Sequence, residues 1–325
     1  MAQRSYLLLS RRGLSLAALT MLFSGLLIAQ SYNHFTLHQY NPSYLNPASS
    51  TRNDEVRLAA FHRSQYVGLS SEAIGAQVVS VDAKLPSRPF TAGIHFSHDY
   101  IGLQRLMGLR IDGGWQIIRK DKFLLATGFG LGFRNLSWAG DQMITPEGIY
   151  VGTIDHQDDV LLNTSFNAQG FEWRAGIQLS YNRLSVDFGS LNFPMAKRNG
   201  ENNYNVAASS QSWLRIKYQL DLGNQWRLTP QTLILSDGRL FQYSLSVHLT
   251  ADKWLLGFNQ RGLNSTSLEA LGMTVGYTFG KNFQVLYNYE YNLSLLRGVN
   301  MGSHELCLKW RRPVKAKVGT WGRVY

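Results

Sequence analysis

The sequence contains a single cysteine, Cys307, among its 325 residues. One cysteine excludes an intrachain disulfide and a zinc site built from cysteine ligands. After its first 29 residues the chain has no run of 18 consecutive apolar residues, so that part lacks a segment suited to cross a membrane as a helix. Basic residues are interleaved with acidic ones through most of the chain and no known nucleic-acid motif is present, which argues against nucleic-acid binding.

Recognisable catalytic and metal-binding patterns are also scarce. Ser97, His98 and Asp99 have the side chains of a hydrolytic relay, but neighbours on a strand point to alternate faces and cannot form one. The loop at 155–159 places three aspartates around His156, yet the spacing fits no known cation site, and a solvated acidic loop is favoured. We therefore expect no catalytic site, no metal site and no cofactor. An enzyme would be reconsidered if replacing His98 or Asp99 abolished a hydrolytic activity.

The N-terminus has the layout of a secretory signal peptide, which is removed on export. Three arginines precede an uncharged apolar run over residues 13–28, and Ala29-Gln30 offers a cleavage site. We predict a signal peptide over residues 1–29. The alternative, an N-terminal membrane anchor, is disfavoured because the run is shorter than the roughly 20 residues of a spanning helix. Cleavage lowers the formal charge from +11 to +8, since it removes three arginines and no acid.

Segments of about ten residues alternate apolar with polar side chains from Val56 to Trp310, and residues 241–250 (FQYSLSVHLT) show the pattern in one stretch. A period of two is typical of a β-strand with one apolar and one polar face. A strand that spans a bilayer needs roughly 9–11 tilted residues. Many such strands in hairpin order predict an all-β fold, a transmembrane antiparallel barrel over residues 56–310 whose outward side chains contact outer-membrane lipids.

The pattern predicts fourteen strands. They begin near Val56, Ala76, Phe90, Arg105, Phe123, Phe166, Leu184, Gln211, Trp226, Leu240, Trp254, Leu268, Phe283 and Ser303. Six tight turns alternate with seven mostly longer connections, the largest at about 139–165 and 194–210. Short periplasmic turns and long external loops are typical of bacterial outer-membrane barrels, so both termini are predicted to be periplasmic. A soluble β-sandwich also alternates, but its strands are usually shorter and its loops need not be sorted by length.

The phase of the alternation assigns side chains to the lumen, because the opposite phase would place charges such as Arg215 against hydrocarbon at roughly 2–4 kcal/mol each near the midplane. The predicted lumen charges are Asp82, Lys84, Arg110, Asp112, Glu172, Arg174, Asp187, Arg215, Lys217, Asp221, Glu305 and Lys309. Both signs are present, which favours a network of ion pairs that keeps the barrel shut over a polar conduit with binding groups. Inward glycines at 128, 130 and 132 leave room for a plug or a close-packed neighbour.

Residues 34–48 (HFTLHQYNPSYLNPA) resemble the opening signature of the PorP/SprF family of type IX secretion. Residues 62–69 (HRSQYVGL) are similar to its next block, with Tyr66 where tryptophan is usual, and residues 98–102 (HDYIG) are similar to a later one. The resemblance covers almost the whole mature chain. Departures from the family's usual sequence, such as Ser49-Ser50, bear on which subgroup of the family the chain belongs to. The motif residues that are candidates for partner contacts are Gln39, Asn41, Pro42, Asn46, Pro47, Arg63, Gln65, Gly68, Asp99 and Gly102.

The resemblance implies a non-enzymatic outer-membrane component of the type IX system of Bacteroidota. Such proteins support secretion or surface attachment of cargo with C-terminal sorting domains, in some cases gliding adhesins, and work beside a periplasmic ring and lipoprotein complex. The alternative is a channel for small or hydrophobic solutes that resembles the fatty-acid transporters. Two Asn-Pro pairs at 41–42 and 46–47 force an extended, kinked path. We therefore hypothesise that residues 30–55 form a periplasmic segment that tucks into the mouth of the barrel.

Residues 311–325 form a basic tail without an acid. Its cations are Arg311, Arg312, Lys315, Lys317 and Arg323. Trp310 is an aromatic residue of the kind that ends the last strand of many barrels, and Pro313 cannot donate to a strand ladder. Two interpretations stay open: the tail docks an acidic partner or anionic headgroups in the periplasm, or it is a plain disordered extension.

Overall fold

The computed structural model of the protein describes residues 35–51, 54–69, 74–84, 88–158, 163–193, 195–197, 209–238, 240–263 and 267–314. The predicted signal peptide and the tail residues Lys315, Lys317 and Arg323 lie outside this part of the chain. None of the helices within it is long and apolar enough to cross a membrane.

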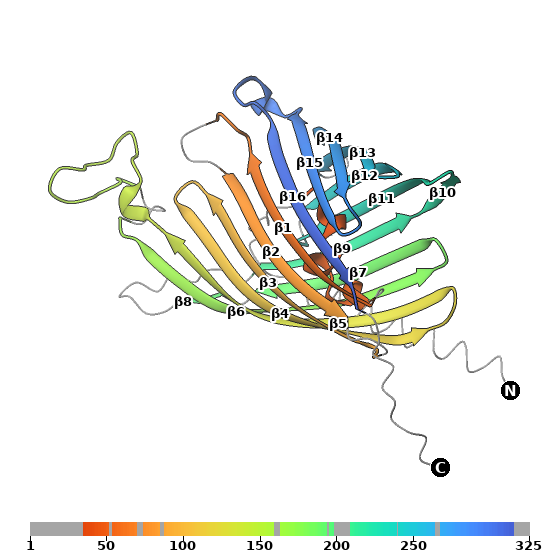
Figure 1. Ribbon diagram of the computed structural model, residues 1–325. Coiled ribbons are helices and arrows are strands. Elements are labelled where there is room, and N and C mark those ends of the chain that lie inside the picture. The colour runs from red at the N-terminus through yellow and green to blue at the C-terminus, as the bar shows by residue number, and fades with distance from the viewer. Residues whose placement is uncertain are drawn as a thin grey trace, which may run out of the picture.

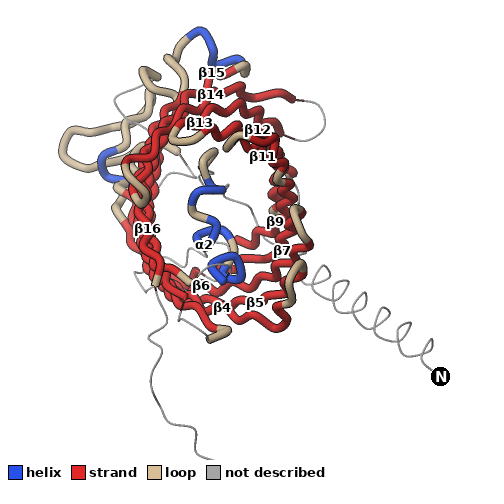
Figure 2. Tube along the Cα trace, turned by 45° about the vertical axis from the view of Figure 1, so that its right-hand side comes forward, coloured by secondary structure: helices blue, strands red, loops and turns tan. Residues whose placement is uncertain are grey.

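The strands form one antiparallel sheet that closes on itself. The long strands pair in sequence order around the barrel. The sheet closes where β1 (Glu55–Gln65) pairs with β16 (Ser303–Pro313), and β9 (Ser209–Tyr218) joins β7 (Leu184–Phe193) to β11 (Trp226–Ser236). Figure 1 shows the strands side by side around the barrel, and Figure 2 shows the ring that they make. The predicted up-and-down barrel is confirmed.

The remaining strands are β2 (Ile74–Lys84), β3 (Phe90–Ile101), β4 (Gln104–Arg119), β5 (Phe123–Trp138), β6 (Phe166–Tyr181), β8 (Met195–Lys197), β10 (Leu220–Gly223), β12 (Phe241–Ala251), β13 (Trp254–Leu263), β14 (Ser267–Phe279) and β15 (Phe283–Asn292). Short β8 continues β7 along β6, and short β10 continues β9 along β11, so the sixteen segments make fourteen barrel strands. Each begins within two residues of its predicted start. The last strand runs to Pro313, three residues beyond the predicted barrel end, and therefore contains Arg311 and Arg312.

Alternation separates the two faces of the wall as the sequence predicts. On β6 the outward residues Phe171, Trp173, Ile177, Leu179 and Tyr181 are exposed and outward Ala175 is half-buried, whereas the alternate residues 172, 174, 176, 178 and 180 are buried. A sheet whose exposed face carries such a row needs an apolar solvent, and a closed barrel leaves no unpaired strand edge in that solvent.

The tight turns lie where turn residues cluster in the sequence. Asn182 joins β6 to β7, Asp252 joins β12 to β13, and both adopt a positive φ. Asparagine and aspartate tolerate the left-handed region, which the two-residue turns of hairpins require. Gly280, between β14 and β15, also has a positive φ of 59°.

Residues 35–51, here called the plug segment, lie inside the ring of strands (Figure 2). They form three short helices, η1 (His38–Tyr40), α2 (Pro42–Leu45) and η2 (Pro47–Thr51). Two further 3-10 turns, η3 (Gly140–Gln142) and η4 (Leu295–Gly298), belong to the connections after β5 and β15.

Candidate functional site

The plug segment owes its path to the two Asn-Pro pairs. Pro42 occupies the first turn of α2 and Pro47 begins η2, positions where a missing backbone N–H costs no helical hydrogen bond. The residue before each proline is kept out of the helical region, so η1, α2 and η2 stay separate. The result is a compact, kinked chain rather than one helix.

Part of the lumen is apolar, which differs from the predicted polar interior. Phe35 and Leu37 of the plug segment are buried in a cluster with inward side chains of five strands, and Tyr40 and Tyr44 pack against it. The inward members of this cluster are Ala59, Phe61, Ala76, Val78, Leu255, Leu286 and Cys307. Leu45 packs on a second cluster of Leu191, Trp213, Leu233 and Leu235. Burial of these two apolar clusters stabilises the plug segment inside the barrel through the hydrophobic effect.

The first polar anchor is an ion-pair cluster on β1, β15 and β16. Arg63, with 1% of its side chain exposed, pairs with Glu290 at 2.7 Å and with Glu305 at 2.9 Å. The two Glu305 oxygens accept the backbone N–H groups of Thr36 and Leu37, each at 2.8 Å. The plug segment thus completes the hydrogen bonding of a buried carboxylate, as a buried charge requires.

A second anchor holds the backbone of α2. Arg110 on β4 donates to the Tyr44 carbonyl at 3.1 Å, and Arg174 on β6 donates to the carbonyls of Tyr44 and Leu45, the latter at 3.1 Å. Both guanidinium groups also lie over the Tyr44 ring, at 5.0 and 5.7 Å from its centroid. Cation–π contacts of this kind strengthen when the pair is shielded from water. Burial raises the pKa of the Tyr44 hydroxyl, so the ring stays neutral.

A third anchor lies on β7 and β9. Asp187 accepts hydrogen bonds from Asn46 Nδ2 at 3.1 Å and Ser49 Oγ at 2.5 Å, and it pairs with Arg215 at 2.9 Å. On β2, Asp82 accepts a hydrogen bond from Ser43 Oγ at 3.0 Å. The charged side chains of these anchors therefore form ion pairs with one another and hydrogen bonds with the plug segment.

His38 contributes a neutral anchor. Its Nδ1 donates to the Phe35 carbonyl at 3.0 Å, and its Nε2 accepts from the Gln231 amide on β11 at 2.7 Å. Burial, together with the charge of Arg215, lowers the pKa of His38 to about 3. The imidazole is uncharged at neutral pH, which suits a site with both ring nitrogens already bonded.

The predicted lumen charges occupy inward positions of the strands. Nine of the twelve are buried: Asp82, Lys84, Arg110, Asp112, Glu172, Arg174, Asp187, Arg215 and Glu305. Lys217 and Lys309 are half-buried. Asp221 is the exception. It lies on the short strand β10, is exposed to solvent, and forms an ion pair with Arg227 at 2.8 Å.

Sequence reasoning missed several members of these clusters. Glu290, Arg134 and Arg261 are buried: Glu290 pairs with Arg63, Arg134 with Glu172, and Arg261 with Glu290. The alternation did carry the signal: Glu290 stands between the outward residues Tyr289 and Tyr291. The alternation therefore predicts that Glu290 faces the lumen, and it could have been included among the lumen charges.

The family-motif residues fall into two sets. Gln39, Asn41, Pro42, Asn46 and Pro47 lie in or cap the plug helices, and Arg63 and Asp99 point into the lumen. Gln65 ends β1, whereas Gly68 and Gly102 lie in loops with positive φ values of 87° and 55°. The structure thus brings seven of the ten to the plug and its walls.

Gly128 gives a test of how tightly the plug fits. A Cβ at this inward position of β5 would lie 2.5 Å from the Pro47 carbonyl carbon, which is too close for a real contact. We expect Gly128→Val to displace η2 and to lower the free energy of unfolding by about 1–3 kcal/mol, as overpacking does. Protease protection of the plug segment and urea unfolding in lipid vesicles measure the two effects.

Gly113 on β4 is the matched control for Gly128. It is exposed on the outer face, and a Cβ there would meet no atom closer than Phe129 O at 3.9 Å. Gly113→Val should change stability by no more than about 0.5 kcal/mol and leave plug protection intact. Equal effects from the two valines would mean that the fit around Pro47 is loose.

The longest described connection, residues 139–158 after β5, is a second surface of interest. Ile144 and Val151 are 84% and 92% exposed. His156 holds the loop from inside: it is fully buried, and its Nε2 donates to the Gly140 carbonyl at 2.8 Å. Within the described residues no three His, Cys, Asp or Glu side chains are grouped so as to hold a metal ion. The loop therefore presents apolar side chains on an internally bonded frame.

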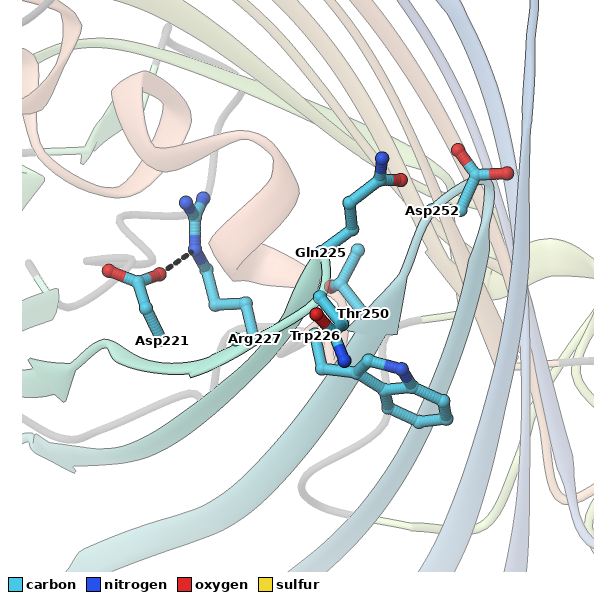
Figure 3. Close-up of a pocket in the computed structure, with 8 residues that line it drawn as sticks. Asp221, Gln225, Trp226, Arg227, Thr250 and Asp252 are labelled. Carbon is cyan, nitrogen blue, oxygen red and sulfur yellow. Dashed lines mark hydrogen bonds and ion pairs between the residues drawn. The ribbon is translucent and has the colours of Figure 1, made fainter.

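A cavity of about 470 Å³ lies between the β10–β11 and β12–β13 turns (Figure 3). Asp221 and Arg227 form an ion pair on one side of it, and Gln225, Thr250 and Asp252 line the other. Asp221, Gln225, Arg227 and Asp252 are exposed, so the cavity is an open notch between turns. Its lining shows no buried polar group that would select a ligand.

Comparisons with known proteins agree with this architecture. The family model for the type IX secretion system membrane protein PorP/SprF matches residues 27–310. No curated protein matches the chain. Among solved structures, the toluene transporter TbuX of Ralstonia pickettii superposes with a TM-score of 0.53 at 11% identity, covering 85% of this chain and 94% of its own. A Pseudomonas aeruginosa FadL homologue gives a TM-score of 0.44 at 10% identity, with coverage of 84% and 93%.

Proposed function

The chain belongs to the PorP/SprF family of type IX secretion system membrane proteins, and from this premise we propose that it is a non-enzymatic outer-membrane scaffold for cargo export. In this role the external loops meet cargo proteins that bear C-terminal sorting domains. The periplasmic face meets the ring and lipoprotein components of the system. Both termini lie in the periplasm.

The filled lumen is the observation that best supports this role. The plug segment is bonded to strands around the barrel through Glu305, Arg110, Asp187 and Gln231. An open diffusion pore needs a continuous water-filled path, whereas a scaffold needs only a rigid wall with exposed loops. The likeness to TbuX concerns the fold alone, so a channel for hydrophobic solutes is the weaker alternative.

The loop over residues 139–158 is our candidate for the cargo contact. Exposed apolar side chains that are grouped on a surface mark interaction sites, and this loop carries Ile144, Ile149, Val151 and Ile154, all exposed. The acids Asp141, Glu147 and Asp155 surround them, and the loop has no Lys or Arg. A cargo domain with a basic rim and an apolar centre would be complementary.

We expect the double variant Ile144→Asp, Val151→Asp to reduce surface attachment of sorting-domain cargo strongly in the native host. Charged side chains remove the apolar centre of the contact while the barrel remains intact, since both positions are exposed. The readout is cargo recovered from the cell surface, with the amount of barrel in the outer membrane measured in parallel.

Val299→Asp is the matched control, because Val299 is 59% exposed on a different loop, after β15. It should leave cargo attachment unchanged. Affinity purification of the wild-type chain should also recover ring and lipoprotein components. Normal cargo attachment in a strain that lacks the chain altogether would refute the proposed function.

A further inference from the structure

The outer wall is polar in one sector that faces the membrane. Six side chains on β15, β16, β1, β2 and β3 form it, here called the polar wall patch: His62, Ser64, Gln77, His98, Tyr289 and His304. Each is exposed or half-buried, and each except Ser64, which lies between buried Arg63 and half-buried Gln65, stands between two buried, inward residues. Elsewhere the same face is apolar, as on β6 from Phe171 to Tyr181.

The register makes this patch continuous. His62 lies opposite Gln77, and Gln77 lies opposite His98 on the next strand. On the other side Ser64 lies opposite His304, and His304 lies opposite Tyr289. His62 Nε2 and Ser64 Oγ are 3.1 Å apart. Directly paired residues on neighbouring strands have touching side chains, so the six form one surface.

The patch lies at a depth that lipid would otherwise occupy. Strands β1 and β2 have 11 residues each, and a bilayer crossing uses roughly 9–11 residues of a tilted strand. Nearly all of β1 is therefore needed to span, yet its outward apolar row ends after Val56, Leu58 and Ala60. Imidazole, amide and hydroxyl groups facing hydrocarbon would lose hydrogen bonds that water or protein supplies.

The chemistry of the patch points to a protein and not to a charged headgroup. Its six members include no carboxylate, lysine or arginine, whereas anionic headgroups are held by fixed cations. Imidazole, amide and hydroxyl groups offer both hydrogen-bond donors and acceptors, so a surface made of them can pair with a copy of itself. A second copy also presents the same groups at the same membrane depth by construction.

We propose that the polar wall patch is the interface of a homodimer whose two-fold axis runs along the membrane normal. A two-fold interface uses one surface twice, which matches the self-complementary hydrogen bonding. The dimer covers the polar groups and leaves the long apolar rows of β4, β5 and β6 to lipid. This inference concerns assembly and stands apart from the proposed role in secretion.

Single-cysteine cross-linking tests the dimer in native outer membranes. The native Cys307 is fully buried on the inner face, so it contributes no background. Cysteines are placed one at a time at Ser64, Gln77 and His304, and membranes are treated with a short bis-maleimide. We expect a covalent dimer of this chain from these positions, identified by mass spectrometry of the cross-linked band.

Controls decide between this interface and other causes. Ile177→Cys on β6 is 50% exposed on the apolar row from Phe171 to Tyr181 and should give no dimer. The triple variant His62→Leu, His98→Leu, His304→Leu should lose the Gln77→Cys dimer while the barrel still folds, as shown by its heat-shifted mobility in detergent gels. Monomer alone from all three positions, with each cysteine still labelled by a monomaleimide, would overturn the proposal. An equal yield of dimer from Ile177→Cys, or cross-links to a different protein, would also overturn the proposal.

Discussion

Deleting residues 35–50 should convert a closed barrel into a conducting one. The segment fills the lumen between strands as far apart as β2, β7 and β16. A fourteen-stranded barrel is wider than the eight-stranded barrels that side chains alone can fill, so an emptied lumen admits water. In planar bilayers we expect the wild-type protein to be silent and the deleted protein to carry a steady open-pore current.

The deleted barrel should still fold, because its charges keep partners in the wall. Arg63 retains Glu290 and Glu305, and Asp187 retains Arg215. A synthetic peptide of residues 35–50 added to the deleted protein should reduce the current, whereas a scrambled peptide of the same composition should not. A wild-type current as large as that of the deletion variant would show that the segment does not seal the lumen, and would revive the solute channel.

The strands could be predicted from the sequence because lipid and lumen impose a period of two on every strand. Fourteen starts were predicted within two residues, and the inward phase was found for charges such as Arg215 and Glu172. A single-residue slip would expose Arg215 to hydrocarbon, so the register is strongly specified. Tight turns were visible for the same local reason, as at Asn182 and Asp252.

The interior of the plug could not be predicted in the same way. Its helices are only three to five residues long and carry no periodic pattern, so their shape depends on two prolines and on contacts distant in sequence. Glu305 and Thr36 are 269 residues apart, and no local rule joins them. The inward apolar residues Leu233 and Leu286 signalled that something apolar lies inside, but not what.

Replacing Arg63 by methionine should be the most destabilising single substitution in the lumen wall. The guanidinium is buried between Glu290 and Glu305, and removing it leaves Glu305 without its cation and Glu290 with the longer Arg261 contact at 3.4 Å. Breaking a buried ion pair by removing one partner typically costs about 3–5 kcal/mol, because the remaining charge is desolvated and unpaired. The measurement is the free energy of unfolding from urea titration in lipid vesicles.

Arg227→Met provides the matched control, since Arg227 makes an ion pair of 2.8 Å with Asp221 but both side chains are about half exposed. Exposed pairs contribute only about 0–1 kcal/mol, so this variant should remain close to wild type. Adding Glu305→Gln to Arg63→Met removes one of the stranded charges and should recover part of the loss, as a coupled pair does in a double-mutant cycle. Additive losses in that cycle would mean that Arg63 acts through packing alone, and the charge cluster would then have no role in holding the plug segment.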